Sequence, residues 1–143
     1  MTPLSLTIAR LQVALTAQTR RVLAEHGSLT LPEWRVLRVV GAGIATRSTA
    51  VRHEAFIDKG QFSRTLDALR EHDLVVLRQA PDDHRQSEIR LTRRGRAAYA
   101  RIAPALDDRH ARFFGVLNER EHATFVRSLE RVLDALEARG GDD

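Results

Sequence analysis

The clearest group of residues that could bind a ligand through hydrogen bonds lies on a predicted helix that follows Asp58. Its apolar residues Phe62, Leu66 and Leu69 recur on one face, and that face should point toward a core. The other side carries small and polar residues: Gly60, Ser63, Arg64 and Asp67, with Gln61 at the flank and Lys59 at the start of the helix. Amide and guanidinium groups form paired hydrogen bonds with adenine and guanine, whereas lysine, serine and a helix N-terminus suit phosphate. The pattern predicts a helix that enters a DNA major groove, and a plain solvated helix face is the alternative.

A second group of polar residues lies in a predicted hairpin loop. Residues 74–78 and 87–91 have short strand patterns, and the polar stretch 79–86 between them contains a proline. We expect Arg85 on this loop to enter a minor groove, whose negative potential attracts arginine, with His84 as a further contact. We expect Asp83 to orient the Arg85 guanidinium through an ion pair. The alternative is a mobile loop with one exposed ion pair, which would contribute little energy.

Four predicted helices precede this hairpin and two follow it. The first four lie at residues 4 to about 25, after a Thr30–Glu33 capping box, at about 48–55, and after Asp58. Thr92 caps a fifth helix, which we expect Pro104 to bend or break, and a capping box at Asn118–Glu121 opens the last. This order predicts a mainly α fold with a small β-hairpin wing, which is a winged helix-turn-helix.

The two outer helices carry apolar stripes without an obvious partner in so short a chain. The residues of these stripes are Leu4, Ile8, Leu11 and Leu15 near the start, and Phe125, Leu129, Val132 and Leu136 near the end. A homodimer would bury both stripes, whereas packing on the same domain is the alternative. We therefore predict a single domain over 1–143, with a DNA-binding region at 30–96 and dimerisation helices at 4–26 and 97–138.

Composition argues against several classes of function. The chain has no cysteine, and its six histidines lack the spacing of metal ligands. No phosphate loop, nucleophile motif or paired carboxylate site is present, so we expect no enzyme activity, no metal and no cofactor. No apolar run suffices to span a bilayer and no export signal is evident, which predicts a cytoplasmic protein without a membrane partner. Residues 47–96 hold eleven basic and eight acidic side chains, a modest positive excess.

Several segments together resemble the MarR family of transcription regulators. The stretch 58–69 is similar to the family's recognition helix, and 70–75 is similar to the helix end and strand start that follow it. The wing pattern is present as Asp83 and Arg85, then Leu91-Thr92 and Gly95. Residues 29–37 are similar to the family's second helix, so the resemblance covers about 10–138 in all.

This resemblance implies a homodimer with intertwined terminal helices and two winged helix-turn-helix lobes on pseudo-palindromic double-stranded DNA. It also implies a repressor, or less often an activator, that small aromatic or phenolic acids release from DNA. Trp34 and Arg38 are candidate ligand contacts, and their alternative roles are core residue and surface residue.

Two departures from the family pattern bear on these expectations. Asp73 stands where the family usually has a helix-ending glycine, and aspartate tolerates the left-handed conformation better than most residues. Arg52 stands where the family usually has a small alanine between two helices, so its long side chain must reach outward or shift a helix. Arg52 and the modest charge motivate the alternative function, a dimeric interaction protein that kept the fold and lost specific DNA binding.

Overall fold

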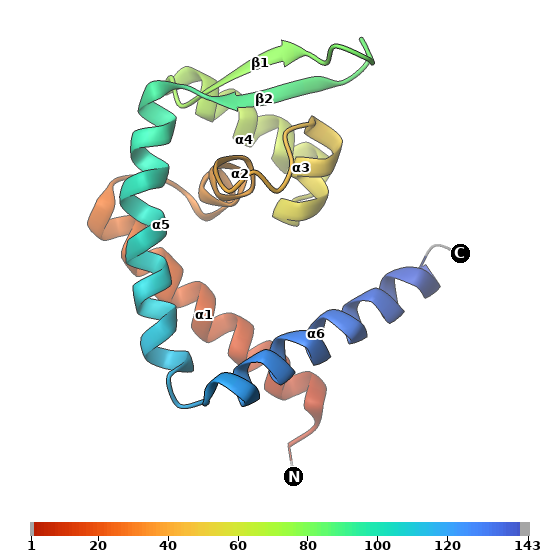
Figure 1. The fold of residues 1–143 in the computed structure, drawn as a ribbon. Coiled ribbons are helices and arrows are strands. Elements are labelled where there is room, and N and C mark those ends of the chain that lie inside the picture. The colour runs from red at the N-terminus through yellow and green to blue at the C-terminus, as the bar shows by residue number, and fades with distance from the viewer. Residues whose placement is uncertain (1, 141–143) are drawn as a thin grey trace. The chain divides into compact units, whose positions relative to one another are not determined.

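The computed structural model describes residues 2–140 and contains the predicted order of elements (Figure 1). The elements are α1 (Leu4–His26), α2 (Leu31–Gly41), α3 (Ser48–Ala55), α4 (Lys59–Glu71), β1 (Val75–Gln79), β2 (Ser87–Leu91), α5 (Arg93–Phe114) and α6 (Glu119–Gly140). The mainly α fold class with a β-hairpin wing is therefore confirmed. The chain divides into two compact units, one reaching to Leu106 and the other beginning at Asp107. The functional boundaries predicted from the sequence stay a prediction.

The predicted helix caps are all present. At α2 the Thr30 hydroxyl oxygen accepts from the Glu33 N–H at 3.3 Å, while the Glu33 carboxylate accepts from the Thr30 N–H at 3.2 Å. At α4 the Asp58 carboxylate accepts from the Gln61 N–H at 2.8 Å. These side chains satisfy backbone donors that have no partner inside the helix, which fixes where each helix begins.

Pro104 does not break its helix, so that part of the expectation is wrong, while a bend at Pro104 stays a prediction. It lies inside α5, which is assigned as one helix from Arg93 to Phe114. Proline removes one N–H donor from the helical ladder. The exposed position of Pro104 leaves the ring in solvent rather than in the core. The helix therefore tolerates one missing hydrogen bond here.

One hydrophobic core holds the first unit together. Its most buried large side chains come from different elements: Leu37 on α2, Leu69 on α4, Ile89 on β2 and Ile102 on α5. Removing a buried side chain of this size typically costs about 2–5 kcal/mol. Because α4 and the wing share this core, the two predicted DNA-binding groups are held in a fixed relation.

The wing is an antiparallel hairpin with an extra attachment along β2. Val75 pairs with Leu91 and Gln79 pairs with Ser87, so the two strands are in register over their full length. Along β2, the Ile89 N–H donates to the Thr46 carbonyl at 2.8 Å, next to an isolated bridge between residues 47 and 88. This contact, which was not predicted from the sequence, ties the start of α3 to the wing.

The second unit consists of the end of α5, a turn and α6. The Asn118 side chain accepts from the Glu121 N–H at 2.9 Å, and the Glu121 carboxylate accepts from the Asn118 N–H at 2.9 Å, which confirms the predicted capping box. The Phe114 ring lies 6.0 Å from His122 and 6.4 Å from Phe125 between centroids, and these rings pack around the turn. No residue of α6 among those the structure describes is buried in the single chain.

Candidate nucleic-acid interface

The helix-turn-helix consists of α3, a short turn and α4. Val51, Ala55 and Ile57 are buried and anchor both helices in the core. Between them Phe56 adopts the left-handed conformation (φ 56°) and is 84% exposed. A bulky residue with this φ is unusual, because its Cβ crowds the backbone.

Arg52 does not prevent the helix-turn-helix from forming. Its side chain is half-buried, and the residue lines a shallow recess together with Phe56 and Asp58. The carbonyl of Arg52 accepts from the Ile57 N–H at 3.3 Å, so the end of α3 is hydrogen-bonded. The large side chain is therefore accommodated at the edge of the motif while α3 and α4 both stay regular.

The outward face of α4 is the one that the sequence predicted. Phe62, Leu66 and Leu69 are buried, and the residues on the opposite side are exposed: Lys59, Gly60, Ser63 and Arg64. Gln61 is half-buried at the flank. The helix therefore presents a guanidinium, an ammonium and a hydroxyl on its first two turns, with a glycine between them.

Gly60 keeps the start of this face open. A Cβ placed on Gly60 would find only ordinary contacts, 3.5 Å to an Arg64 guanidinium nitrogen and 3.6 Å to the Asp58 carboxylate. The fold itself therefore does not require glycine at position 60. Another backbone or a base can approach α4 closely at this point.

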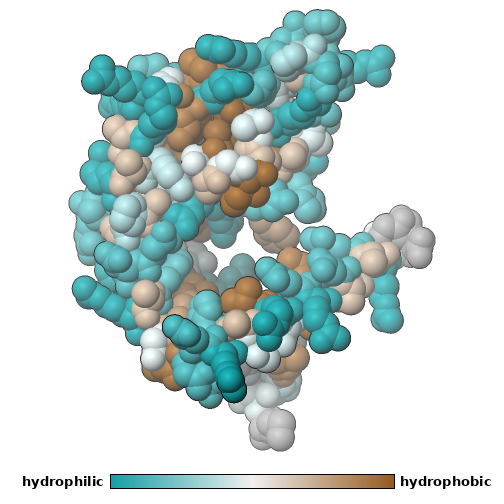
Figure 2. All heavy atoms as spheres, in the orientation of Figure 1, coloured by the Kyte–Doolittle hydropathy of each residue, from teal (hydrophilic) through white to brown (hydrophobic). Residues whose placement is uncertain are grey.

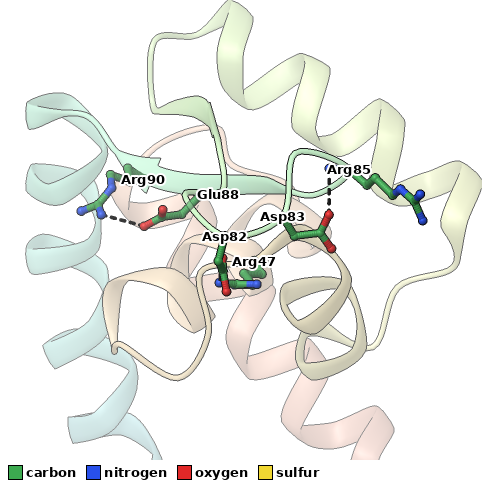
Figure 3. A network of polar contacts seen from close by, with 6 residues as sticks. All are labelled: Arg47, Asp82, Asp83, Arg85, Glu88 and Arg90. Atoms are coloured by element: carbon green, nitrogen blue, oxygen red, sulfur yellow. Dashed lines mark hydrogen bonds and ion pairs between the residues drawn. The ribbon is translucent and has the colours of Figure 1, made fainter.

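The predicted ion pair between Asp83 and the Arg85 guanidinium is wrong. The Asp83 carboxylate instead accepts from the Arg85 backbone N–H at 3.0 Å, and the guanidinium is turned away from it (Figure 3). An aspartate that bonds a backbone N–H two residues on shapes a turn. Asp83 thus sets the shape of the loop and leaves the side chains of His84 and Arg85 exposed.

A different ion pair holds the wing tip. The Arg47 guanidinium pairs with the Asp82 carboxylate, which joins the residue before α3 to the loop between β1 and β2 (Figure 3). On β2 itself, Glu88 and Arg90 pair at 2.6 Å. This pair could not be predicted from local sequence patterns, because Arg47 and Asp82 are 35 positions apart.

Further exposed arginines lie at the start of α5. Arg93, Arg94 and Arg96 are exposed, and an Arg96 guanidinium nitrogen donates to the Leu91 carbonyl at 3.0 Å. Hydrophilic side chains also cover the tip of the wing (Figure 2). The wing tip and the start of α5 both offer exposed hydrogen-bond donors, which suit a polyanion.

The candidate ligand contacts form an aromatic cluster. The Trp34 and Tyr99 rings are stacked with centroids 6.1 Å apart, and the Arg38 guanidinium carbon lies 6.0 Å from the Trp34 ring centroid. Trp34 is buried and Arg38 is half-buried. Because Trp34 is only 4% exposed, its ring belongs to the core, which agrees with its alternative role, and the role of ligand contact stays a prediction.

Residues 2–140 were also searched for a metal site and for a membrane-spanning helix. No group of three or more histidine, cysteine, aspartate or glutamate residues in this part of the chain could hold a metal ion. Over the same residues, no helix is both long and apolar enough to cross a membrane.

Comparisons with known proteins agree with this geometry. A family model described as "MarR family" matches residues 28–86, which confirms the resemblance predicted from the sequence. An uncharacterized HTH-type transcriptional regulator of Staphylococcus aureus (strain MRSA252) is 30% identical over 81 residues, which are 57% of this chain. That match spans 55%, about half, of the relative's own length.

Two solved structures share the fold over almost the whole chain. The transcriptional repressor CouR, bound to a 23-mer DNA duplex, is 25% identical with a TM-score of 0.78, and the match covers 92% of each chain. NadR, in complex with 4-hydroxyphenylacetate, is 23% identical with a TM-score of 0.80, and the match covers 93% of each chain.

Proposed function

We propose that this chain, whose residues 28–86 match the MarR family, is a sequence-specific DNA-binding transcription regulator. The observation that carries the proposal is the exposed polar face of α4, fixed by a shared core beside a wing that exposes His84 and Arg85. CouR, a repressor with this fold, has been solved on a DNA duplex, which supports the same use of the surface here.

In this proposal α4 enters the major groove with its N-terminus first. Arg64 pairs with guanine and Gln61 with adenine, while Lys59 and Ser63 contact phosphate. On the wing Arg85 enters the minor groove, and His84 adds a contact. Gly60 allows close approach, and Asp83 contributes by shaping the loop. The result is a continuous reading surface over two neighbouring grooves.

We propose a homodimer as the binding form. The apolar stripes on α1 and α6 are exposed in the single chain, with Leu4 73% and Leu136 65% exposed. The other residues of the stripes are exposed or only half-buried: Ile8, Leu11, Leu15, Phe125, Leu129 and Val132. A second copy would remove this surface from water at about 25 cal/mol per Å² of apolar area. Two copies would also present two α4 helices to a pseudo-palindromic site.

The finer role we propose is a cytoplasmic repressor without enzyme activity, released by a small aromatic or phenolic acid. In this proposal the half-buried Arg38, whose guanidinium lies beside the Trp34 ring, supplies the positive charge that such a ligand needs. NadR, which has this fold, has been solved with 4-hydroxyphenylacetate.

A fluorescence anisotropy titration with the chain's own upstream intergenic DNA tests the proposal. We expect specific binding that weakens steeply with salt, because phosphate contacts release counterions. Arg64→Ala and Arg85→Ala should each weaken binding by roughly 5- to 150-fold. Arg131→Ala, an exposed arginine on α6, is the matched control and should leave the affinity unchanged.

The same titration separates the second candidate function. A folded dimer that binds the upstream DNA no better than competitor DNA, with little dependence on salt, would favour the interaction protein. Full affinity in both arginine variants would refute the assigned contacts. Addition of 4-hydroxyphenylacetate to the wild-type complex then tests the release.

A further inference from the structure

The turn between α3 and α4 holds a side chain that folding alone does not explain. Phe56 has a φ of 56° and is 84% exposed, so its backbone is strained while its ring gains no burial. A single exposed apolar side chain is ordinary on a protein surface. An exposed ring on a rarely populated backbone conformation is not, and such a combination points to a role in binding.

The hydrogen bonds at the end of α3 are those of a helix that closes with a left-handed residue. The Phe56 N–H donates to the His53 carbonyl at 3.1 Å, and the Ile57 N–H donates to the Arg52 carbonyl at 3.3 Å. Glycine is the usual residue at this position, because it lacks a Cβ and adopts the conformation without strain. Phenylalanine forms the same bonds at a cost in free energy. Closure of the helix therefore does not account for phenylalanine at position 56.

Phe56 borders the shallow recess at the start of α4. The residues that line this recess are Arg52, His53, Phe56, Ile57 and Asp58. The Asp58 carboxylate in this lining is also 3.6 Å from the place that a Cβ on Gly60 would take. The recess therefore adjoins the exposed start of the α4 face. A ligand that lies along this start can extend over Phe56 without a break.

One positive charge of the recess has no partner in the described chain. The two carboxylates at or beside the recess are engaged, since Asp58 accepts from the Gln61 N–H at 2.8 Å and Glu54 lies 3.9 Å from the His53 ring nitrogen. The half-buried Arg52 side chain forms no ion pair or hydrogen bond within residues 2–140. The recess therefore offers an available guanidinium next to an exposed aromatic ring.

The backbone of duplex DNA matches this pair of groups. It alternates an anionic phosphate with a deoxyribose, whose carbon atoms form an apolar face. A guanidinium binds phosphate through paired, charge-assisted hydrogen bonds, and an aromatic ring gains free energy when it covers apolar surface. A protein partner would also cover the Phe56 ring. The available guanidinium and the continuity with α4 favour DNA.

We infer that Phe56 packs on a deoxyribose at the edge of the groove that α4 enters, with Arg52 on the adjacent phosphate. The inference rests on the proposed function, because it needs α4 in the major groove. Contacts to sugar and phosphate carry no direct sequence information, so they add affinity and fix the position of the helix. Arg52 is then part of the DNA interface.

The first test replaces Phe56 in the full chain by the photo-cross-linking residue p-benzoylphenylalanine. Irradiation in the presence of the upstream DNA duplex should give a covalent protein–DNA product. The matched control carries the same replacement at Phe113, which is 48% exposed and lies in the second unit. This control should give no protein–DNA product.

The second test compares affinities and their salt dependence. Phe56→Gly should weaken binding to upstream and competitor DNA by the same factor, about tenfold, because an apolar contact of moderate size is lost. The slope of log affinity against log salt should not change, since no charge is removed. Arg52→Gln should instead reduce that slope by about 0.9, the value for one phosphate.

Two further measurements separate a DNA contact from a role in the shape of the turn. Phe56→Gly should raise Tm by about 2 °C, because glycine relieves the left-handed strain. Phe56→Leu keeps an apolar side chain and should bind within about threefold of the wild type. A variant that loses both stability and affinity would show that Phe56 acts through the turn, which overturns the inference.

The remaining outcomes distinguish this inference from the proposed function. A complex that forms but gives no cross-link at position 56 would overturn the inference and leave the proposed function standing. An equal affinity of Phe56→Gly and the wild type would do the same. A wild-type chain that binds neither upstream nor competitor DNA would refute both.

Discussion

Gly95→Ala should destabilise the protein although it places a better helix former inside a helix. A Cβ on Gly95 would lie 2.0 Å from the Leu74 carbonyl oxygen and 3.0 Å from its carbon. Ordinary contact begins at 3.4 Å, so α5 or the start of β1 must move by more than 1 Å. That carbonyl also accepts from the Thr92 N–H at 3.0 Å, and the movement strains this bond.

The expected loss of unfolding free energy in Gly95→Ala is the sum of three contributions of opposite sign. Replacing glycine by alanine in a helix gains about 1 kcal/mol. Forcing an atom into a packed site typically costs about 1–3 kcal/mol, and a weakened hydrogen bond adds about 1 kcal/mol. Because Gly95 meets rigid backbone rather than a flexible side chain, we take the upper part of this range. The net loss is about 3 kcal/mol, which lowers Tm by about 9 °C for a chain of this length.

Thermal unfolding followed by circular dichroism measures this change. All variants must be compared at one chain concentration, because the proposed dimer would make Tm depend on concentration. Gly60→Ala is the matched control, since a Cβ there makes only ordinary contacts. It should gain about 0.5–1 kcal/mol from helix propensity alone. A Gly95→Ala protein that unfolds at or above the wild-type temperature would refute the reasoning.

Three further changes test other parts of the structure. Gly60→Ala should weaken DNA binding about tenfold in an anisotropy titration, because the methyl group blocks close approach of a base or phosphate. The same change should raise Tm. Unchanged affinity would show that α4 does not approach DNA at this point. Asp73→Gly should raise stability by about 0.5 kcal/mol, seen as a higher urea midpoint with an unchanged slope, since Asp73 has a φ of 57°; a lower midpoint would contradict this. Leu136→Glu should convert the dimer to a folded monomer in analytical ultracentrifugation. Leu136 is 65% exposed in the single chain, so the substitution costs the monomer little stability. A persistent dimer would exclude α6 from the interface.

The parts of the fold that depend on neighbouring residues were predictable from the sequence. Thr30, Asp58 and Asn118 each cap a helix through a bond to a residue three positions on, and such bonds follow directly from residue type and spacing. The left-handed turn at Asp73 was also predictable, because a helix must end there before a strand begins. The exposed face of α4 followed from its apolar period.

The parts that depend on distant contacts or on competing partners were not predictable. Arg47 meets Asp82 only because residues 46–47 attach along β2, and nothing in the local pattern near Arg47 signals this. The Asp83 carboxylate could bond either the backbone N–H or the guanidinium of Arg85. It bonds the backbone N–H, which is nearer and less flexible than the guanidinium. Phe56 gave no sign of its left-handed conformation, because glycine or asparagine is the usual signal for that turn.

The ion pair between Arg47 and Asp82 affects how the salt dependence of DNA affinity should be interpreted. Both side chains are substantially exposed, at 41% and 66%, so added salt screens their attraction as it screens phosphate contacts. Rising ionic strength therefore loosens the wing tip while it also restores the counterions of DNA. The fall of log affinity with log salt contains both processes, and its slope overstates the number of phosphates neutralised. In an Asp82→Asn variant the ion pair is absent at every salt concentration. The salt slope of that variant therefore gives the number of phosphates that the protein neutralises.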